Sequence, residues 1–117
     1  MEAVSLFNLL EQKNSYLLEY HKLNVNELDR LAKRRVENLE DFYYSRELLL
    51  DAISKVDTKI SKNKIENLDV NKKQKKRLVS ILNLKRKMVM SILDQDLTIL
   101  SLVNELKKGK TQDKEII

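Results

Sequence analysis

The chain has 117 residues, with no proline, no cysteine and a single glycine, and its formal net charge at pH 7 is +5. Turn-rich β and α/β folds need glycine and proline at their corners, so this composition predicts a single all-α domain. Without cysteine the chain has no disulfide framework and no thiolate ligands, and the lone histidine, His21, does not make a metal site by itself, so we expect no metal and no cofactor.

The first predicted helix spans about residues 2–33, where apolar side chains recur at close to 3.5-residue spacing. The segment opens MEAVSLFNLLEQ, which lacks the basic region of a signal peptide, and no uncharged run in the chain exceeds eight residues. A membrane span needs about 20 apolar residues, so we expect a cytoplasmic protein with no membrane span. His21 flanks the apolar stripe and is interpreted as a surface or boundary residue. The stripe consists of Leu6, Leu10, Leu17, Tyr20 and Leu31.

The second predicted helix spans about residues 37–65, after a break at residues 34–37. Without that break, one helix would run from residue 2 to residue 65 and would be much longer than the third segment that has to cover it. Asn38 and Asp41 are the N-cap candidates. Arg46 is the one charged residue in an apolar seam formed by Leu39, Phe42, Leu49, Ile53, Val56 and Ile60.

Arg46 needs a carboxylate partner if it lies in this seam. We expect Asp96 of the third helix to provide it, and such a polar pair fixes the register of the helices. Just before Arg46, Phe42, Tyr43 and Tyr44 are adjacent in sequence, so their rings cannot all face one core. Phe42 is assigned to the seam and Tyr43 to its edge. Tyr44 is expected to pack its ring on another helix while its hydroxyl reaches water.

The third predicted helix spans about residues 70–108. Asp69 and Asn71 are its N-cap candidates, and Gly109 is a natural residue to follow its last turn. Residues 109–117 are expected to form a flexible tail.

Two apolar stripes run along this third segment, about 100° apart around a helix. One comprises Leu78, Leu82, Met88, Ile92, Ile99, Val103 and Leu106, and the other comprises Val79, Val89, Leu93, Leu97 and Leu100. Two interpretations stay open: a helix held by two neighbours in a three-helix core, or a partly exposed groove for a partner helix. Methionine favours the second, because its thioether adapts to partners of different shape. The candidate partner-binding residues are Met90, Leu93, Leu97, Leu100 and Asn104.

Positive charge is concentrated in the same segment. Residues 71–117 carry twelve basic and five acidic groups, whereas the rest of the chain has a slight acidic excess. We interpret the densest cluster, the basic patch, as a solvated face or as a docking patch for an acidic protein. Nucleic-acid binding is the less favoured alternative, because no aromatic residue is interleaved for base stacking. The basic patch comprises Lys72, Lys73, Lys75, Lys76 and Arg77.

Motifs typical of enzymes are absent from the sequence. It contains no glycine-rich phosphate loop, no nucleophile elbow and no HExxH metal motif. The sequence therefore predicts a non-enzymatic protein. A small helical mutase that uses buried cations is the alternative, and Arg46 is its one candidate residue.

Residues 5–65 resemble the flagellar type III export chaperones of the FlgN/FliT kind. The similarity lies in YLLEYHKLNVNELDRL of the first helix, a short break, an acidic-aromatic start, and Arg46 followed by Leu49, Leu50 and Ile53. The resemblance implies a small cytoplasmic helical protein that escorts hook-associated or cap subunits. It also implies that the C-terminal helical region captures an amphipathic helix of the export substrate.

Taken together, the sequence predicts an antiparallel three-helix bundle, or coiled coil, over residues 1–108. Its expected role is that of a cytoplasmic chaperone or adaptor whose partner is an amphipathic helix of another protein. Two alternatives stay open: a structural coiled-coil module that forms a homodimer, and a basic helical protein that binds nucleic acid.

Overall fold

The computed structural model describes residues 3–62 and 69–116, which form three helices and no strand. The helices are α1 (Ala3–Ala32), α2 (Leu39–Ser61) and α3 (Lys72–Ile116). The all-α three-helix architecture predicted from the composition is confirmed. The predicted break at residues 34–37 is also present, because the chain leaves the helical conformation between α1 and α2.

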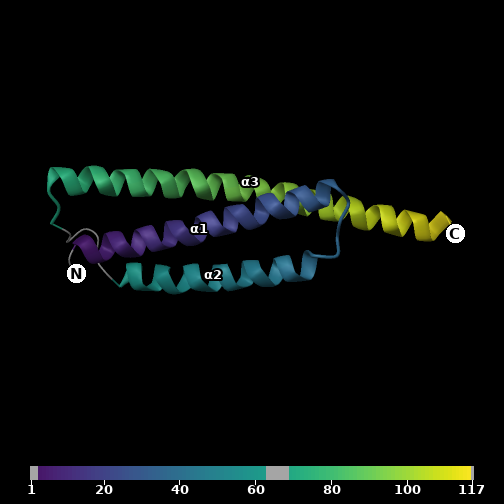
Figure 1. Cartoon of the computed structure of the whole chain (residues 1–117), viewed down its shortest axis with the longest axis horizontal. Helices are drawn as coiled ribbons and strands as arrows, with labels where there is room; N and C mark the ends of the chain where they lie inside the picture. The colour runs from purple at the N-terminus through teal and green to yellow at the C-terminus, as the bar shows by residue number, and fades with distance from the viewer. Residues whose placement is uncertain (1–2, 63–68, 117) are drawn as a thin grey trace.

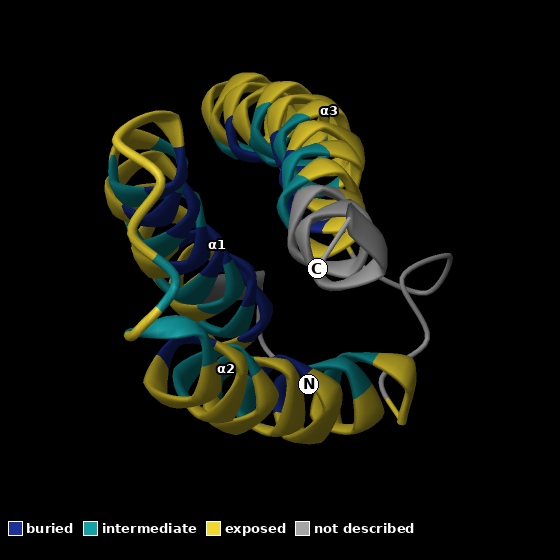
Figure 2. Cartoon of the chain, turned by 90° about the vertical axis from the view of Figure 1, so that its right-hand side faces the viewer, coloured by how far each residue is buried: buried dark blue, intermediate teal, exposed yellow. Residues whose placement is uncertain are grey.

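α1 lies between the other two helices and packs along both of them (Figure 1). α2 runs antiparallel to α1, and α3 returns in the direction of α1, which is the predicted up-down-up order. Within the described residues, no Cα atom of α2 lies within 8 Å of a Cα atom of α3. Seen along the bundle, α2 and α3 lie on two sides of α1, whose buried face is turned toward both (Figure 2). We call the side between α2 and α3 the open side, because the two backbones are not in contact there and only their side chains share the core layers.

α1 ends in a Schellman motif with an arginine where glycine is usual. Arg34 has a φ of 59°, in the left-handed region. Its N–H donates to the Leu31 carbonyl at 2.9 Å, and the Arg35 N–H donates to the Arg30 carbonyl at 2.8 Å. These two bonds satisfy carbonyls at the helix end that would otherwise lack partners. A side chain in this conformation costs roughly 1–2 kcal/mol compared with glycine.

α3 begins in a reciprocal capping box, which selects Asn71 over Asp69 as the N-cap. The Asn71 side chain accepts a hydrogen bond from the Gln74 N–H at 2.8 Å, and the Gln74 side chain accepts one from the Asn71 N–H at 3.1 Å. Each side chain satisfies a backbone donor of the first helical turn. At the start of α2, by contrast, Asn38 occupies the N-cap position without a side-chain capping bond.

The helix ends differ from the predicted ones in two places. α3 was expected to stop at Lys108 before a flexible tail over residues 109–117, but it continues through Gly109 to Ile116. Glycine inside a helix costs about 1 kcal/mol relative to alanine, and the polar residues that follow it can continue a helix. α2 was expected to reach residue 65; it ends at Ser61, and residues 63–65 lie outside the described part of the chain.

The core consists of three layers stacked along the bundle. The layer at the α1 N-terminus contains Leu6, Phe7, Leu10 and Ile81, the middle layer contains Leu17, Tyr20, Ile53 and Ile92, and the last contains Leu31, Phe42, Ile99 and Val103. On α3 the buried position is Ile81 rather than the expected Leu82, which is 40% exposed. No helix, within the residues described, has a stretch apolar enough to traverse a bilayer.

Candidate functional site

An exposed row of mostly apolar side chains runs along α3. We call this row the outer stripe. It consists of six large apolar residues and two polar ones, Arg86 and Asn104, spaced three or four residues apart: Val79, Leu82, Arg86, Met90, Leu93, Leu97, Leu100 and Asn104. The exposed fractions of Met90, Leu93, Leu97 and Leu100 are 65%, 58%, 67% and 57%. The five candidate partner-binding residues of the sequence analysis therefore lie together on the surface, since Asn104 is exposed as well.

The opposite side of α3 explains why the outer stripe is left uncovered. Ile92, Ile99 and Val103 are buried against the other helices. α2 would have to approach α3 to cover a second face, but the two backbones stay apart. Val89 is the exception among the predicted second-stripe residues, because it is half-buried and packs against the middle core layer. Contiguous exposed apolar surface of this kind marks interaction sites in soluble proteins.

The basic patch divides into two parts with different roles. Lys72, Lys73, Lys75 and Lys76 are exposed at the start of α3. Arg77 instead pairs with Glu11 of α1, to which its Nε donates at 3.1 Å, and its guanidinium lies 5.1 Å from the centre of the Phe7 ring. Arg77 therefore stabilises the packing of α3 on α1. The positive charge that faces solvent comes from the four lysines.

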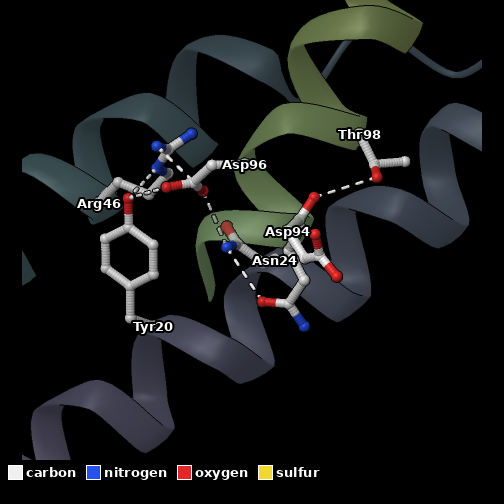
Figure 3. A network of polar contacts seen from close by, with 7 residues as sticks. Tyr20, Asn24, Arg46, Asp94, Asp96 and Thr98 are labelled. Atoms are coloured by element: carbon white, nitrogen blue, oxygen red, sulfur yellow. Dashed lines mark hydrogen bonds and ion pairs between the residues drawn. The ribbon is translucent and has the colours of Figure 1, made fainter. Parts of the chain in front are cut away.

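A polar cluster joins all three helices in the middle of the bundle (Figure 3). Arg46 of α2 donates from Nε to the Tyr20 hydroxyl at 2.8 Å, and its Nη2 forms an ion pair with Asp96 Oδ1 at 3.2 Å. Its guanidinium also lies over the rings of Tyr20 and Phe42, at 5.2 and 5.1 Å from their centres. The predicted pairing of Arg46 with Asp96 is confirmed.

Tyr20 and Asn24 of α1 complete this cluster. The Tyr20 hydroxyl donates to Asp96 Oδ2 at 3.4 Å, and the Asn24 amide donates to Asp96 Oδ1 at 3.0 Å and to Gln95 Oε1 at 3.2 Å. Burial raises the pKa of the Tyr20 phenol above 10.0, although the hydrogen bond from Arg46 partly offsets this effect. The phenol therefore stays protonated at neutral pH, as a donor to Asp96 requires.

The cluster's groups pair with one another across helices, so their geometry is that of a structural network. His21 lies at its edge, half-buried, with Nδ1 2.7 Å from Gln95 Nε2, in keeping with a boundary residue. Within the described residues, no group of three or more His, Cys, Asp or Glu side chains could hold a metal ion.

Three buried polar residues of α1 escaped the sequence analysis. Asn24 and Glu27 are fully buried and Asn14 is 8% exposed. The Asn24 and Asn14 side-chain oxygens and both Glu27 carboxylate oxygens have no hydrogen-bond partner within the described structure. The signal was present in the sequence, because the repeat that passes through Leu17 and Tyr20 next falls at positions 24 and 27.

The prediction for Tyr44 is wrong. Tyr44 is 66% exposed, so its ring does not pack on another helix. On α2, position 44 lies on the face opposite the buried Phe42 and Ile53. Tyr43 does cover the edge of the seam, since its ring centre lies 5.5 Å from that of Phe42, while 43% of the residue stays exposed.

Comparisons with known proteins found no matching family model, no matching curated protein and no matching solved structure.

Proposed function

We propose that this protein is a non-enzymatic helical chaperone or adaptor that binds an amphipathic helix of a partner protein through the outer stripe of α3. The observation that supports the proposal is the exposure of Leu93, Leu97 and Leu100, each more than half accessible, on a helix whose other face is already packed. Side chains three and four residues apart form the surface on which a partner helix lies in a helix-in-groove complex.

The finer proposal is that the partner is a hook-associated or cap subunit of a flagellar export system, bound in the cytoplasm. It rests on the resemblance of residues 5–65 to the FlgN/FliT export chaperones. Purified C-terminal helices of such subunits, tested for binding to this protein by calorimetry, distinguish this partner from other amphipathic helices.

The general proposal is tested by comparing two exposed positions on α3 with a neighbouring buried one. Leu97→Ala and Leu100→Ala should leave the free energy of unfolding within about 1 kcal/mol of wild type, because both side chains are exposed. Ile99→Ala is the matched control, and it should cost about 2–5 kcal/mol because Ile99 is 2% exposed in the core.

Each variant is then compared with wild type for retention of the proteins that wild type captures from a native lysate, identified by mass spectrometry. Leu97→Ala and Leu100→Ala should lose captured partners at unchanged stability, as hot-spot residues do. Full retention of every captured protein by both variants would show that the outer stripe is not the binding surface.

A further inference from the structure

Two shallow hollows lie one after the other along the first half of α3, about 80° apart around the helix. The first is lined by Lys72, Lys75, Lys76, Val79 and Ser80. The second is lined by Leu82, Asn83, Lys85, Arg86, Val89 and Met90. Each lining includes four residues related as i, i+3, i+4 and i+7, a diamond on a helix surface that can receive one side chain of a facing helix. The hollows are ten residues apart, or about 15 Å along the helix.

Both hollows combine an apolar residue with uncompensated positive charge. Three lysines surround the first hollow, and Lys85 and Arg86 border the second. Within the described structure, none of these five cations forms an ion pair with a carboxylate, in contrast to Arg77, which pairs with Glu11. Any occupant that fills these hollows with apolar side chains and supplies carboxylates beside them would complement both their shape and their charge.

The hollows are continuous with the outer stripe. Val79, Leu82 and Arg86 belong both to the stripe and to the lining of the hollows. A helix that lies on Leu93 and Leu97 can therefore extend toward the start of α3 and run along the edge of each hollow. We propose that the start of α3 binds the acidic end of the partner helix, which places apolar side chains against Val79 and Leu82 and carboxylates next to the lysines.

This inference rests on the proposed function and adds the chemical class of the partner. A nucleic acid would use the same cations, but phosphate contacts do not require a valine or a leucine in the wall of each hollow. No aromatic residue lies among the lining side chains to stack on a base. The combination of apolar side chains in the hollows and neighbouring cations without carboxylate partners favours an acidic amphipathic helix.

The test uses two synthetic helical peptides of 28 residues, added as fluorescent probes to the full chain. Both carry leucine at the three-four spacing of an amphipathic helix; one has glutamate at the flanking positions of its first half and the other has lysine there. The wild-type chain should bind the glutamate peptide at least about tenfold more tightly than the lysine peptide at low salt, because unlike charges attract across the interface. The preference should shrink as salt rises.

The variant Lys72→Glu/Lys75→Glu/Lys76→Glu should reverse this preference. Its matched control is Lys22→Glu/Arg35→Glu/Lys62→Glu, which changes the net charge equally at exposed positions away from the hollows and should keep the preference for the glutamate peptide. Circular dichroism verifies that both variants retain the helical fold.

Several outcomes overturn the inference. The inference of an acidic partner end is wrong if wild type binds both peptides equally, or if the two triple variants have equal effects. The proposed function still holds in that case, provided that Leu97→Ala weakens peptide binding. If Leu97→Ala does not weaken peptide binding either, both the proposed function and the acidic partner end are wrong. A wild-type dimer that the first triple variant abolishes would assign the hollows to a second copy, and tighter binding of a 20-base-pair DNA duplex than of the glutamate peptide would assign them to nucleic acid.

Discussion

The protonation state of Tyr20 makes the stability of the bundle depend on pH in the alkaline range. Its phenol donates to Asp96 and accepts from Arg46, and burial raises its pKa above the usual 10.0. A folded-state pKa above the unfolded value gives stability that is fully present below pH 10 and is lost as pH rises through the folded pKa. We expect the free energy of unfolding to fall above about pH 10 more steeply in wild type than in Tyr20→Phe. Urea unfolding of both proteins across this range checks the prediction, and parallel curves would contradict it.

Glu27 makes a second residue-level prediction. Its side chain is fully buried, neither carboxylate oxygen has a hydrogen bond, and the nearest cation, Arg30, is 3.8 Å away and partly exposed. The long ion pair to a partly exposed arginine gives little in return for burying the carboxylate, and replacing a buried ionic side chain with a well-packed apolar one is commonly neutral or stabilising. Glu27→Leu should therefore raise the free energy of unfolding by about 1–3 kcal/mol.

The control for Glu27 is Glu19→Leu on the exposed side of the same helix, which should change stability by less than about 0.5 kcal/mol. Both are measured by urea unfolding. A loss of more than about 1 kcal/mol in Glu27→Leu would mean that the carboxylate has a stabilising partner.

The burial and pairing of a residue could be predicted from the sequence when its chemistry differed from that of the neighbouring positions in its repeat. Arg46 was recognisable because a lone cation in an apolar seam requires a carboxylate, and Asp96 was the candidate because it is flanked by apolar positions of the third helix. Asn24 and Glu27 occupy core positions of α1, as the apolar residues of the same repeat do. A search for apolar residues alone does not detect them. Periodicity extended through every residue type would have found them, whereas their missing hydrogen bonds depend on three-dimensional packing.

At the level of the helices, the end of α1 gives a prediction about backbone conformation. Arg34 holds a left-handed φ that glycine adopts without steric cost. Arg34→Gly should therefore stabilise the protein by about 1 kcal/mol. Arg35→Gly is the matched control: its φ is not positive, so the substitution only adds freedom to the unfolded chain and should be destabilising by up to about 1 kcal/mol. Thermal unfolding of the two variants measures the difference, and equal shifts would argue against a strained helix end.

The positions of the helices in the sequence were easier to predict than the faces of each helix that become buried. Spacing predicted three helices and two apolar stripes on the third. It did not decide whether the stripe with Leu93, Leu97 and Leu100 is covered by another helix, since that depends on how far α2 lies from α3. The same limit explains the choice of Leu82 over Ile81, because adjacent apolar residues satisfy the repeat almost equally well. Gly109 misled the prediction of the α3 end because glycine is compatible both with a helix terminus and, at modest cost, with a helix interior.

For the whole molecule, Arg46 forms an ion pair that links α2 to α3 across the open side. It pairs with Asp96 and with Tyr20, and it is 19% exposed. Loss of a fully buried ion-pair partner costs about 3–5 kcal/mol and loss of an exposed one less than about 1 kcal/mol, so Arg46→Ala should cost about 2–4 kcal/mol.

Lys55→Ala is the comparison for Arg46, because it breaks an exposed pair with Asp51 within α2 and should cost less than about 0.5 kcal/mol. A double-mutant cycle with Asp96→Ala then isolates the coupling between the two side chains. Additive effects would show that the link across the open side contributes nothing to stability.

The central position of α1 also sets the order in which the fold is completed during synthesis. α1 and α2 leave the ribosome first and can form a hairpin, whereas the α1–α3 interface joins residues such as Asn14 and Ile81, 67 positions apart. At about 5–20 residues per second, α3 follows only after several seconds. Until then Leu6, Phe7 and Leu10 lack the Ile81 layer that buries them. The nascent chain is thus most prone to aggregate in the interval before α3 emerges.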